Sequence, residues 1–425
     1  MITLVRLIPA LLIALAACTD APTSANSVAT PAGPEPRVVP TGTPEGCPLG
    51  TTGASGALPG SGALYLICVP PGFDAATGSL VLYAPGSVPP QAPLAIRDDA
   101  IDGQRVSQII TGLGIAFATT SYRENGLIIV EGTRDLQRLA AKFQELYGPL
   151  GGATYGVGIS EGAQVVTLAT ERHPQLFDGA LAACGPIGDF RRQLNYYGDV
   201  RLVFDLLFGP VLAPLLPQLG LTSLGPLDAV PEQVIQLFGT PSQPGPLALL
   251  IAQVVVGNPA LTNELLSRIG LPLQLDASNQ AVVVDVVLRL LGYSFLFGNN
   301  AAEVLGGPPY DNVTPVDYPR PIDGLAVPPY SASQPALSHL AAKYETSGRL
   351  TSPLVTLFNT VDPIIPSWQE TAYQAKVAAA GTSELLVAQI PVDRLGHCAF
   401  TGAEVLGAFA ALVQAVTGQQ LGPAT

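Results

Sequence analysis

The chain has 425 residues, of which 48% are hydrophobic and only 12% are charged, so it can bury a large core and is not a disordered protein. Its formal net charge of −13 repels phosphate backbones and anionic headgroups, which argues against nucleic acid as a partner. Any attachment to a membrane must therefore be covalent or hydrophobic.

The N-terminus has the features of an export signal. Arg6 precedes an apolar run at residues 7–15, which is too short to span a bilayer. The sequence Leu-Ala-Ala then leads to Cys18 and resembles the bacterial lipobox, in which the Cys is acylated and becomes the new N-terminus. We expect residues 1–18 to be a lipoprotein signal peptide, with Cys18 anchoring an exported cell-envelope protein to a lipid bilayer, in the periplasm or at the surface. An ordinary signal peptide cut near a chance cysteine is the alternative.

The next segment, residues 19–46, is rich in Ala, Pro, Thr and Ser and has no apolar periodicity, which predicts a disordered tether. Folded structure is expected from about residue 47. The cysteines that remain after Cys18 are Cys47, Cys68, Cys184 and Cys398. Their even number favours disulfides in an oxidising compartment, and three pairings are possible. No Cys/His spacing typical of zinc is present, and neither a metal nor a cofactor is expected.

Apolar strands alternate with helices in two parts of the chain. Strands are expected at residues 64–69, 79–84, 114–121, 153–158, 177–184, 353–358 and 384–391, and helices at residues 129–147 and 161–173. This alternation predicts an α/β protein with a mostly parallel sheet and helices on both faces.

The pattern breaks between these two parts. Residues 199–297 hold several apolar helical stretches separated by Pro and Gly, each read as too short or too interrupted to cross a membrane. We expect residues 190–335 to form a helical cap inserted into an α/β core made of residues 47–189 and 336–425.

Ser160 is the candidate nucleophile. It lies in a G-x-S-x-G sequence at residues 158–162 (GISEG), between an expected strand and an expected helix. A tight turn there would lift the hydroxyl above the sheet edge, and small glycines would avoid collisions within it. The N-terminal dipole of the following helix would favour a developing oxyanion.

A serine hydroxyl needs a base to act as a nucleophile, and the chain has three histidines. His173 lies at the far end of the helix that follows Ser160, about 20 Å away at 1.5 Å per residue, and cannot reach it. His339 lies in an expected helix and is interpreted as a packing or surface residue. His397 follows an expected strand directly, and we predict that it is the base.

The orienting acid is expected beyond a strand between the nucleophile and the base. Asp362 follows the strand at residues 353–358 and fits this position. Its carboxylate would hold the imidazole tautomer and stabilise the imidazolium. Asp393, four residues before His397, is the alternative acid.

An oxyanion hole requires two backbone donors. The amide of Glu161, directly after the nucleophile, is expected to be one. The second is expected in the loop after the strand at residues 79–84, where Pro85 has no N–H, so that Ser87 or otherwise Gly86 donates.

Together these residues resemble the α/β-hydrolase superfamily, above all secreted bacterial carboxylesterases. The resemblance covers about residues 60–190 and 340–415 and implies a Ser–Asp–His triad at Ser160, Asp362 and His397, below a helical cap.

The adjacent residues His397 and Cys398 also resemble the His-Cys pair of tannases and feruloyl esterases. In that family a Cys directly precedes the nucleophile and bonds the Cys beside the His, whereas this chain has Ile159 at that position. Cys184 ends the next strand near the same sheet edge, so we expect it to bond Cys398 instead. The local pair Cys47–Cys68 then remains.

The leading hypothesis is an exported serine hydrolase that cleaves small-molecule carboxylic esters with apolar or aromatic groups through an acyl-enzyme. A serine peptidase of the same fold is one alternative, for which cap acids such as Glu232, Glu264 and Asp285 would bind a substrate ammonium group. A lipid-anchored binding protein without catalysis is the other. The sequence does not indicate an oligomeric state.

Overall fold

The computed structural model describes residues 39–240 and 243–421. The predicted signal peptide, the lipidation site Cys18 and the tether as far as residue 38 lie outside the described residues. The end of the predicted tether is not free of the fold, because the N–H of Gly53 donates to the carbonyl of Gly42 at 2.9 Å. The Arg105 guanidinium also donates to the carbonyl of Gly46 at 2.7 Å. Ordered contacts therefore begin before residue 47.

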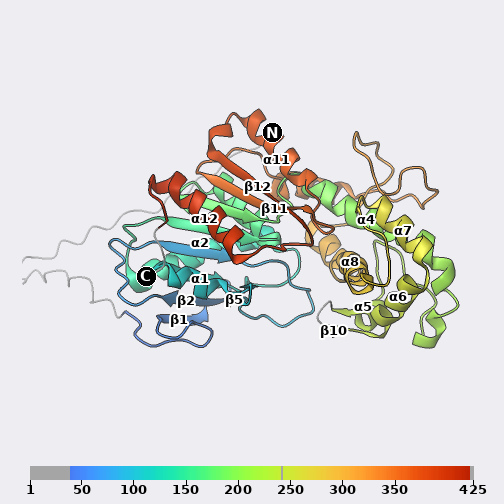
Figure 1. Cartoon of the computed structure of the whole chain (residues 1–425), viewed down its shortest axis with the longest axis horizontal. Helices are drawn as coiled ribbons and strands as arrows, with labels where there is room; N and C mark the ends of the chain where they lie inside the picture. The colour runs from blue at the N-terminus through green and yellow to red at the C-terminus, as the bar shows by residue number, and fades with distance from the viewer. Residues whose placement is uncertain (1–38, 241–242, 422–425) are drawn as a thin grey trace, which may run out of the picture. The chain divides into compact units, whose positions relative to one another are not determined.

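One eight-stranded sheet organises the molecule (Figure 1). In spatial order its strands are β1 (Thr52–Ala57), β2 (Leu64–Val69), β6 (Ala116–Thr120), β3 (Leu80–Ala84), β7 (Thr154–Ile159), β8 (Gly179–Ala183), β11 (Leu354–Val361) and β12 (Leu386–Leu395). Only β2 runs antiparallel to its neighbours, and all other adjacent pairs are parallel. This order, with one reversed strand near the edge, is that of the α/β-hydrolase fold, so the predicted fold class is confirmed.

Helices cover both faces of the sheet. The first face packs against α2 (Ile129–Tyr147), α3 (Glu161–Arg172) and α11 (Trp368–Ala380), and the second against α1 (Val106–Gly112) and α12 (Gly402–Thr417). Successive side chains of a strand point to opposite faces, and in β3 Leu82 accordingly joins the first core and Val81 the second. Two-residue strands β4 (Ala100–Ile101) and β5 (Gln104–Arg105) form a separate hairpin before α1, and η4 (Ser383–Leu385) precedes β12.

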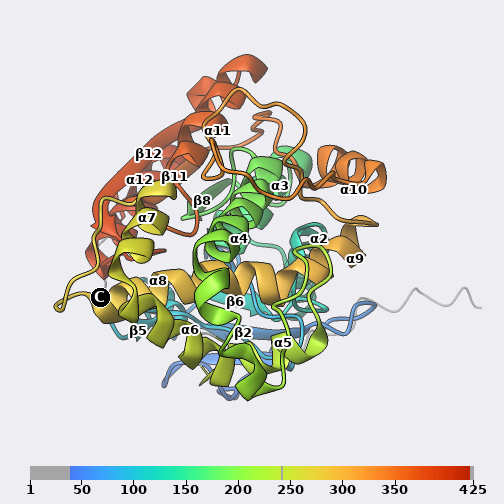
Figure 2. The same ribbon diagram turned by 90° about the vertical axis from the view of Figure 1, so that its right-hand side faces the viewer.

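A layer of helices is inserted between β8 and β11 (Figure 2). It consists of α4 (Phe190–Leu212), η1 (Leu216–Leu219), α5 (Glu232–Phe238), the short strands β9 (Gly239–Thr240) and β10 (Gln243–Pro244), α6 (Pro246–Gly257), α7 (Pro259–Arg268), α8 (Gln280–Gly292), η2 (Tyr293–Phe297) and α9 (Gly298–Leu305). These helices bury a hydrophobic cluster of their own, which Tyr310 and Ile322 of the following segment and Ile364 and Ile365 beyond β11 also join. A long irregular segment then leads to α10 (Gln334–His339) and η3 (Leu340–Tyr344), so α10 crosses the predicted cap limit at residue 335.

One cap helix is longer than the sequence predicted. Elements α8, η2 and α9 form a continuous helical run, Gln280–Leu305, of 26 residues that is long and apolar enough to cross a membrane. The prediction that every apolar cap stretch is too short or too interrupted was therefore wrong, because the glycines at 292 and 298 lie inside this helix and do not end it. Half of its apolar window is buried within the protein, where residues such as Val283 and Leu291 form the cap core.

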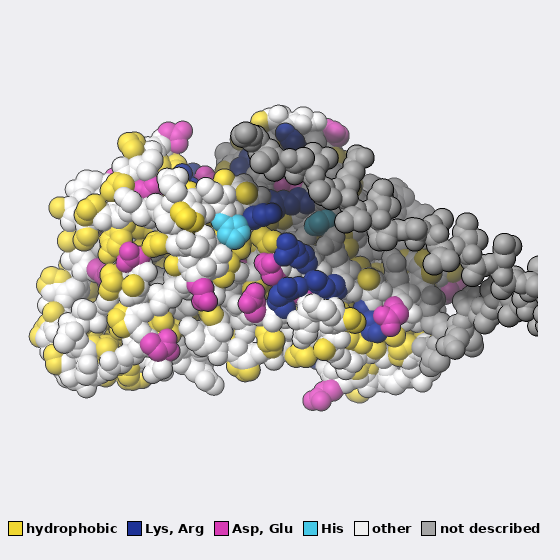
Figure 3. Space-filling model, turned by 180° about the vertical axis from the view of Figure 1, so that it is seen from behind, with side chains coloured by type: hydrophobic (Ala, Val, Ile, Leu, Met, Phe, Trp, Pro, Cys, Tyr) yellow, Lys and Arg dark blue, Asp and Glu magenta, His cyan; other side chains and the backbone are white. Residues whose placement is uncertain are grey.

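The surface carries few charged side chains, as the composition indicates. Figure 3 shows one face on which Lys and Arg gather near the middle while most of the remainder is uncharged. Several cations are paired with acids, such as Arg123 and Arg138, which both contact the buried Asp135.

Candidate active site

Ser160 lies at a sharp turn between β7 and α3. Its backbone has φ 55° and ψ −122°, a left-handed conformation that a residue with a side chain rarely adopts. The flanking glycines allow the turn: a Cβ on Gly158 would lie 2.1 Å from the carbonyl oxygen of Gly162, and one on Gly162 would lie 2.0 Å from that of Ala84. The sequence GISEG thus folds into the strand-to-helix elbow that exposes a serine hydroxyl.

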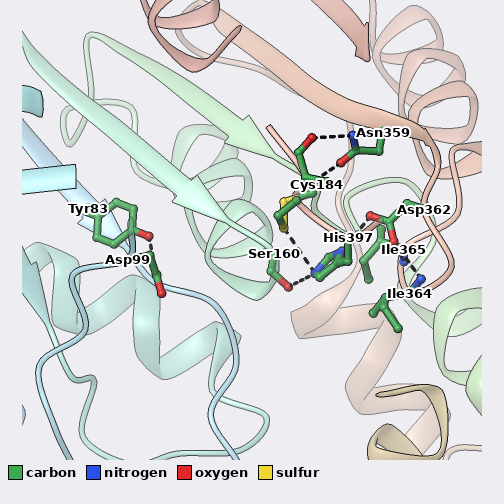
Figure 4. Close-up of a disulfide and its surroundings, with 11 residues drawn as sticks. Tyr83, Asp99, Ser160, Cys184, Asn359, Asp362, Ile364, Ile365 and His397 are labelled. Atoms are coloured by element: carbon green, nitrogen blue, oxygen red, sulfur yellow. Dashed lines mark hydrogen bonds and ion pairs between the residues drawn. A yellow bond between two sulfur atoms is a disulfide. The ribbon is translucent and has the colours of Figure 1, made fainter. Parts of the chain in front are cut away.

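Three side chains from separate strand ends meet at this turn (Figure 4). The Ser160 Oγ lies 2.8 Å from Nε2 of His397, and Nδ1 of His397 lies 2.7 Å from Oδ2 of Asp362. His397 comes two residues after β12, and Asp362 directly after β11. Because Asp362 accepts from Nδ1–H, it leaves Nε2 free to accept the Ser160 proton.

The Asp362 carboxylate is fixed by backbone and cap. Its Oδ1 accepts from the N–H groups of Ile364 and Ile365, at 2.8 and 3.0 Å, and the side chain is 1% exposed. The carbonyls of this loop are held in turn by α4, since the hydroxyl of Tyr196 donates to Pro363 and the amide of Gln193 to Ile364. The cap therefore helps to position the acid.

The alternatives considered from the sequence lie elsewhere. Asp393 is exposed and accepts a hydrogen bond from Thr360 at 3.0 Å. His173 ends α3, away from the elbow, and His339 packs edge-on against Tyr344 with ring centroids 5.7 Å apart. None of these three residues contacts Ser160.

The loop that carries His397 is anchored twice. Disulfides join Cys184 to Cys398 and Cys47 to Cys68, the pairing expected from the sequence. Asn359, which the sequence analysis missed, binds the backbone of Ala399 through both its side-chain atoms. It lies two residues before the end of β11, beside a loop 40 residues away, so no local pattern indicated its role.

The two predicted oxyanion donors flank the nucleophile. No described residue accepts a hydrogen bond from the N–H of Ser87 or of Glu161. Gly86 lies against the elbow, since a Cβ on it would be 3.1 Å from that of Ser160. Arg97, another residue the sequence analysis missed, donates to the carbonyl of Ser87 at 3.1 Å and thereby orients this loop.

Arg97 is itself held by a small network. Its guanidinium pairs with Asp99 at 2.7 Å, and the buried Tyr83 hydroxyl donates to the same carboxylate at 2.5 Å. Figure 4 shows the hydrogen bond between Tyr83 and Asp99, which lies apart from Ser160 and His397 in this view. The chain of contacts runs from β3 to the loop that follows it, which stiffens the expected oxyanion hole.

Glu161 contributes an unusual side chain as well as its amide. The carboxyl is buried and accepts from the N–H of Ile128 at 3.2 Å through one oxygen, while the other has no partner among the described residues. Burial raises the pKa of Glu161 to about 8, so that the group is neutral at pH 7.

Two cavities adjoin the triad. The first, of about 110 Å³, is lined by Ser160 and Ser87 and by apolar side chains of the core and the cap, among them Leu127, Phe190, Leu194 and Leu227. The second is lined by His397, Ser87 and the cap residues Arg289 and Leu296. Room for one water needs only about 10–15 Å³, so the first cavity can hold an organic group of several atoms.

The triad region also contains the one set of described residues with metal-ligand spacing. The ligand atoms of Cys184, His397 and Cys398 lie within 4.8 Å of one another. Both sulfurs are joined in a disulfide, so neither offers the thiolate that a metal requires. These residues do not fit a metal site.

Comparisons with known proteins find only distant similarities. No family model and no curated protein sequence matches the chain. Among solved structures it is similar to an acylaminoacyl peptidase of Pyrococcus horikoshii, at 10% identity and a TM-score of 0.41 over 84% of this chain and 38% of that one. The chain thus spans about two fifths of that peptidase's length.

Two esterases are similar at comparable levels. An esterase of Pyrococcus furiosus shows 12% identity and a TM-score of 0.42 over 91% of this chain and 97% of that one. Feruloyl esterase B of Aspergillus oryzae shows 14% identity and a TM-score of 0.41, over 87% and 82% of the two chains. The fold assignment rests on the strand order and the elbow, not on these similarities.

Proposed function

We propose that this protein is a serine hydrolase that cleaves carboxylic esters through an acyl-enzyme. The observation that carries the proposal is the hydrogen-bonded series Ser160–His397–Asp362, with spacings of 2.8 and 2.7 Å, at a strained strand-to-helix turn. The fold alone does not require a strained serine, two unpaired backbone amides and a carboxylate that fixes the histidine tautomer to lie together. Their occurrence at one place supports a catalytic site.

The hydrogen bonds among Ser160, His397 and Asp362 define the order of the proposed reaction steps. Ser160 attacks the ester carbonyl while His397 takes its proton at Nε2, and Asp362 stabilises the resulting imidazolium. The amides of Ser87 and Glu161 face the oxygen on which negative charge develops. His397 then protonates the departing alcohol, and water repeats the sequence to release the acid.

The first cavity supports esters with apolar or aromatic groups. Its walls are mainly Leu, Phe, Tyr, Pro and Ala, with few charges to hold a phosphate or a sugar acid. Glu161 also lines this cavity, but its buried carboxyl is neutral at pH 7 and adds no charge to the walls. Small-molecule esters of this kind are the substrates we propose.

The three cap acids named for the peptidase alternative do not support it, and Asp228 is the cap acid that lines the first cavity. The three acids suggested for binding an ammonium group lie outside the cavities: Glu264 and Asp285 pair with Arg268 and Arg289, and Glu232 is exposed. Export and lipid anchoring at Cys18 remain part of the proposal, supported by the lipobox-like sequence and by two disulfides, which are stable in an oxidising compartment.

The test is direct. A fluorophosphonate probe should label wild-type protein at Ser160, and Ser160→Ala and His397→Ala should each lower ester turnover by about 10⁴-fold or more while the fold persists. Turnover of p-nitrophenyl esters is compared with that of aminoacyl p-nitroanilides. Preference for the anilides supports the peptidase, whereas no labelling and no turnover of either class supports the binding protein.

A further inference from the structure

The long cap helix contains an irregular turn where it passes the triad. Residues Tyr293–Phe297 form a single π-helical turn between α8 and α9. Such turns are rare and frequently occur at functional sites, because the extra residue redirects the side chains around it. Here the turn begins with Tyr293, which lines both cavities of the site.

Packing fixes the ring of Tyr293. It stacks on Tyr197 of α4 with centroids 4.4 Å apart and planes 4° from parallel, and on Phe297 at 5.4 Å. Two stacked neighbours hold the ring in one orientation. The hydroxyl is therefore presented from a fixed position, as electrostatic catalysis requires.

Tyr293 lies where the two cavities beside the triad meet. One cavity contains Ser160 and the other His397, and Ser87 and Tyr293 border both. An ester must place its acyl group on one side of the attacked carbon and its alcohol on the other. A substrate that occupies both cavities thus has its carbonyl at their junction, beside Tyr293.

Tyr293 shares the first cavity with Ser87 and Ser160. It interacts with the side chains of Ser87 and Ser160. Since the Ser160 proton is directed to His397, the Tyr293 hydroxyl keeps its own proton for an acceptor in the cavity. Burial also raises the pKa of Tyr293, which keeps the phenol protonated and able to donate.

We propose that the Tyr293 hydroxyl is a catalytic hydrogen-bond donor that the cap adds to the oxyanion hole. This proposal rests on the esterase function above. As the Ser160 Oγ bonds to the carbonyl carbon, its proton passes to His397 and the C=O electron pair moves to oxygen. Tyr293 donates a hydrogen bond to that oxygen without losing its proton, and the alcohol departs with the proton from His397. The cap is then part of the catalytic machinery and not only a cover.

The test is Tyr293→Phe, which keeps the stacked ring and removes only the hydroxyl. Loss of one oxyanion donor should lower kcat for a p-nitrophenyl ester by about 10²–10³-fold, with a much smaller change in KM. Affinity for a phenylboronic acid, whose tetrahedral serine adduct carries the same negative oxygen, should fall with kcat/KM. Tyr330→Phe is the matched control in the cap, outside both cavities, and should keep wild-type kcat.

Other outcomes separate the possibilities. Wild-type kcat and boronate affinity in a folded Tyr293→Phe protein overturn the proposal while leaving the esterase function intact. Phe297→Leu, which removes a stacked ring but keeps the hydroxyl, should reduce kcat less than Tyr293→Phe, and the reverse order assigns Tyr293 a packing role only. Absence of ester turnover and of Ser160 labelling in the wild type defeats the proposed function itself.

Discussion

Asn359 binds both backbone groups of Ala399: its Oδ1 accepts from the N–H at 2.8 Å, and its Nδ2 donates to the carbonyl at 3.1 Å. The side chain is fully buried and lies on the sheet, while Ala399 follows His397 by two residues. This contact fixes the base loop against β11, the strand that also leads to Asp362.

Asn359→Ala should therefore weaken both stability and catalysis. The N–H of Ala399 loses its acceptor, which costs about 1–3 kcal/mol of unfolding free energy, whereas the carbonyl of Ala399 keeps the Arg394 guanidinium as a donor. The value of kcat should fall because His397 is less well placed. Denaturant unfolding and ester kinetics measure the two effects. Asn312→Ala is a matched control, since Asn312 makes the same paired contacts with Tyr330 and Pro328 in the cap. Equal kcat in both variants contradicts the positioning role.

Asp362→Asn and Asp393→Asn decide between the two acids considered from the sequence. An amide at position 362 would favour the wrong imidazole tautomer, and we expect kcat to fall by about 10⁴-fold. Asp393 is exposed and contacts Thr360, so its variant should keep most of its activity. The pH–rate profile of each variant is the measurement, and a larger loss at position 393 would show that the triad assignment is wrong.

The two disulfides should contribute differently. The Cys184–Cys398 bond closes a loop of 214 residues and the Cys47–Cys68 bond one of 21, for which the chain-entropy relation gives about 5 and 3 kcal/mol. Replacing the first pair by Ser should lower both Tm and kcat, because Cys398 is adjacent to His397. Replacing the second pair should lower Tm alone. A kcat loss that is the same for both pairs argues against a bracing role for the first.

Glu161 predicts a pH dependence of stability. Its folded-state pKa of about 8 lies above the ordinary carboxyl value of 4.5, so between these pH values the folded state binds a proton that the unfolded state has released. Stability from this group is complete below about pH 4.5 and is lost as the pH rises through 8, by up to about 1.4 kcal/mol per pH unit. Glu161→Gln should make the unfolding free energy fall less steeply between pH 7 and 8. This window is chosen because burial raises the pKa of Glu370 to about 7, so Glu370 contributes mainly below it. The exposed Glu232→Gln is the control, and an unchanged slope in Glu161→Gln contradicts the prediction.

Local patterns were sufficient for several elements of the α/β core. The helix expected at 129–147 and the strand at 64–69 have those bounds in the structure, because each combines clear periodicity with a Gly or Pro boundary. Helix α12 was missed, although Thr401 and Glu404 form a capping box with the T-x-x-E spacing that such a start requires. Its uniformly apolar sequence hid the helical period.

The supporting residues could not be found in the same way. Arg97, Asn359 and Tyr293 act through contacts with residues that are 10 to 40 or more positions away, and the spacing of each along the chain is unremarkable in itself. A nucleophile motif is a local feature, whereas the bracing of an oxyanion loop or of a base loop depends on tertiary packing. Sequence patterns therefore indicate the local motif but not the tertiary contacts that support it.

The bond between Cys184 and Cys398 also bears on proteolysis. The whole cap lies between these two cysteines, so a single peptide cleavage anywhere in it would leave two fragments that stay covalently linked. Ser160 would belong to one fragment and His397 to the other, yet the Cys398 sulfur of the linkage lies 3.4 Å from Nε2 of His397. A protein nicked in its cap therefore keeps Ser160 and His397 in one covalently linked molecule.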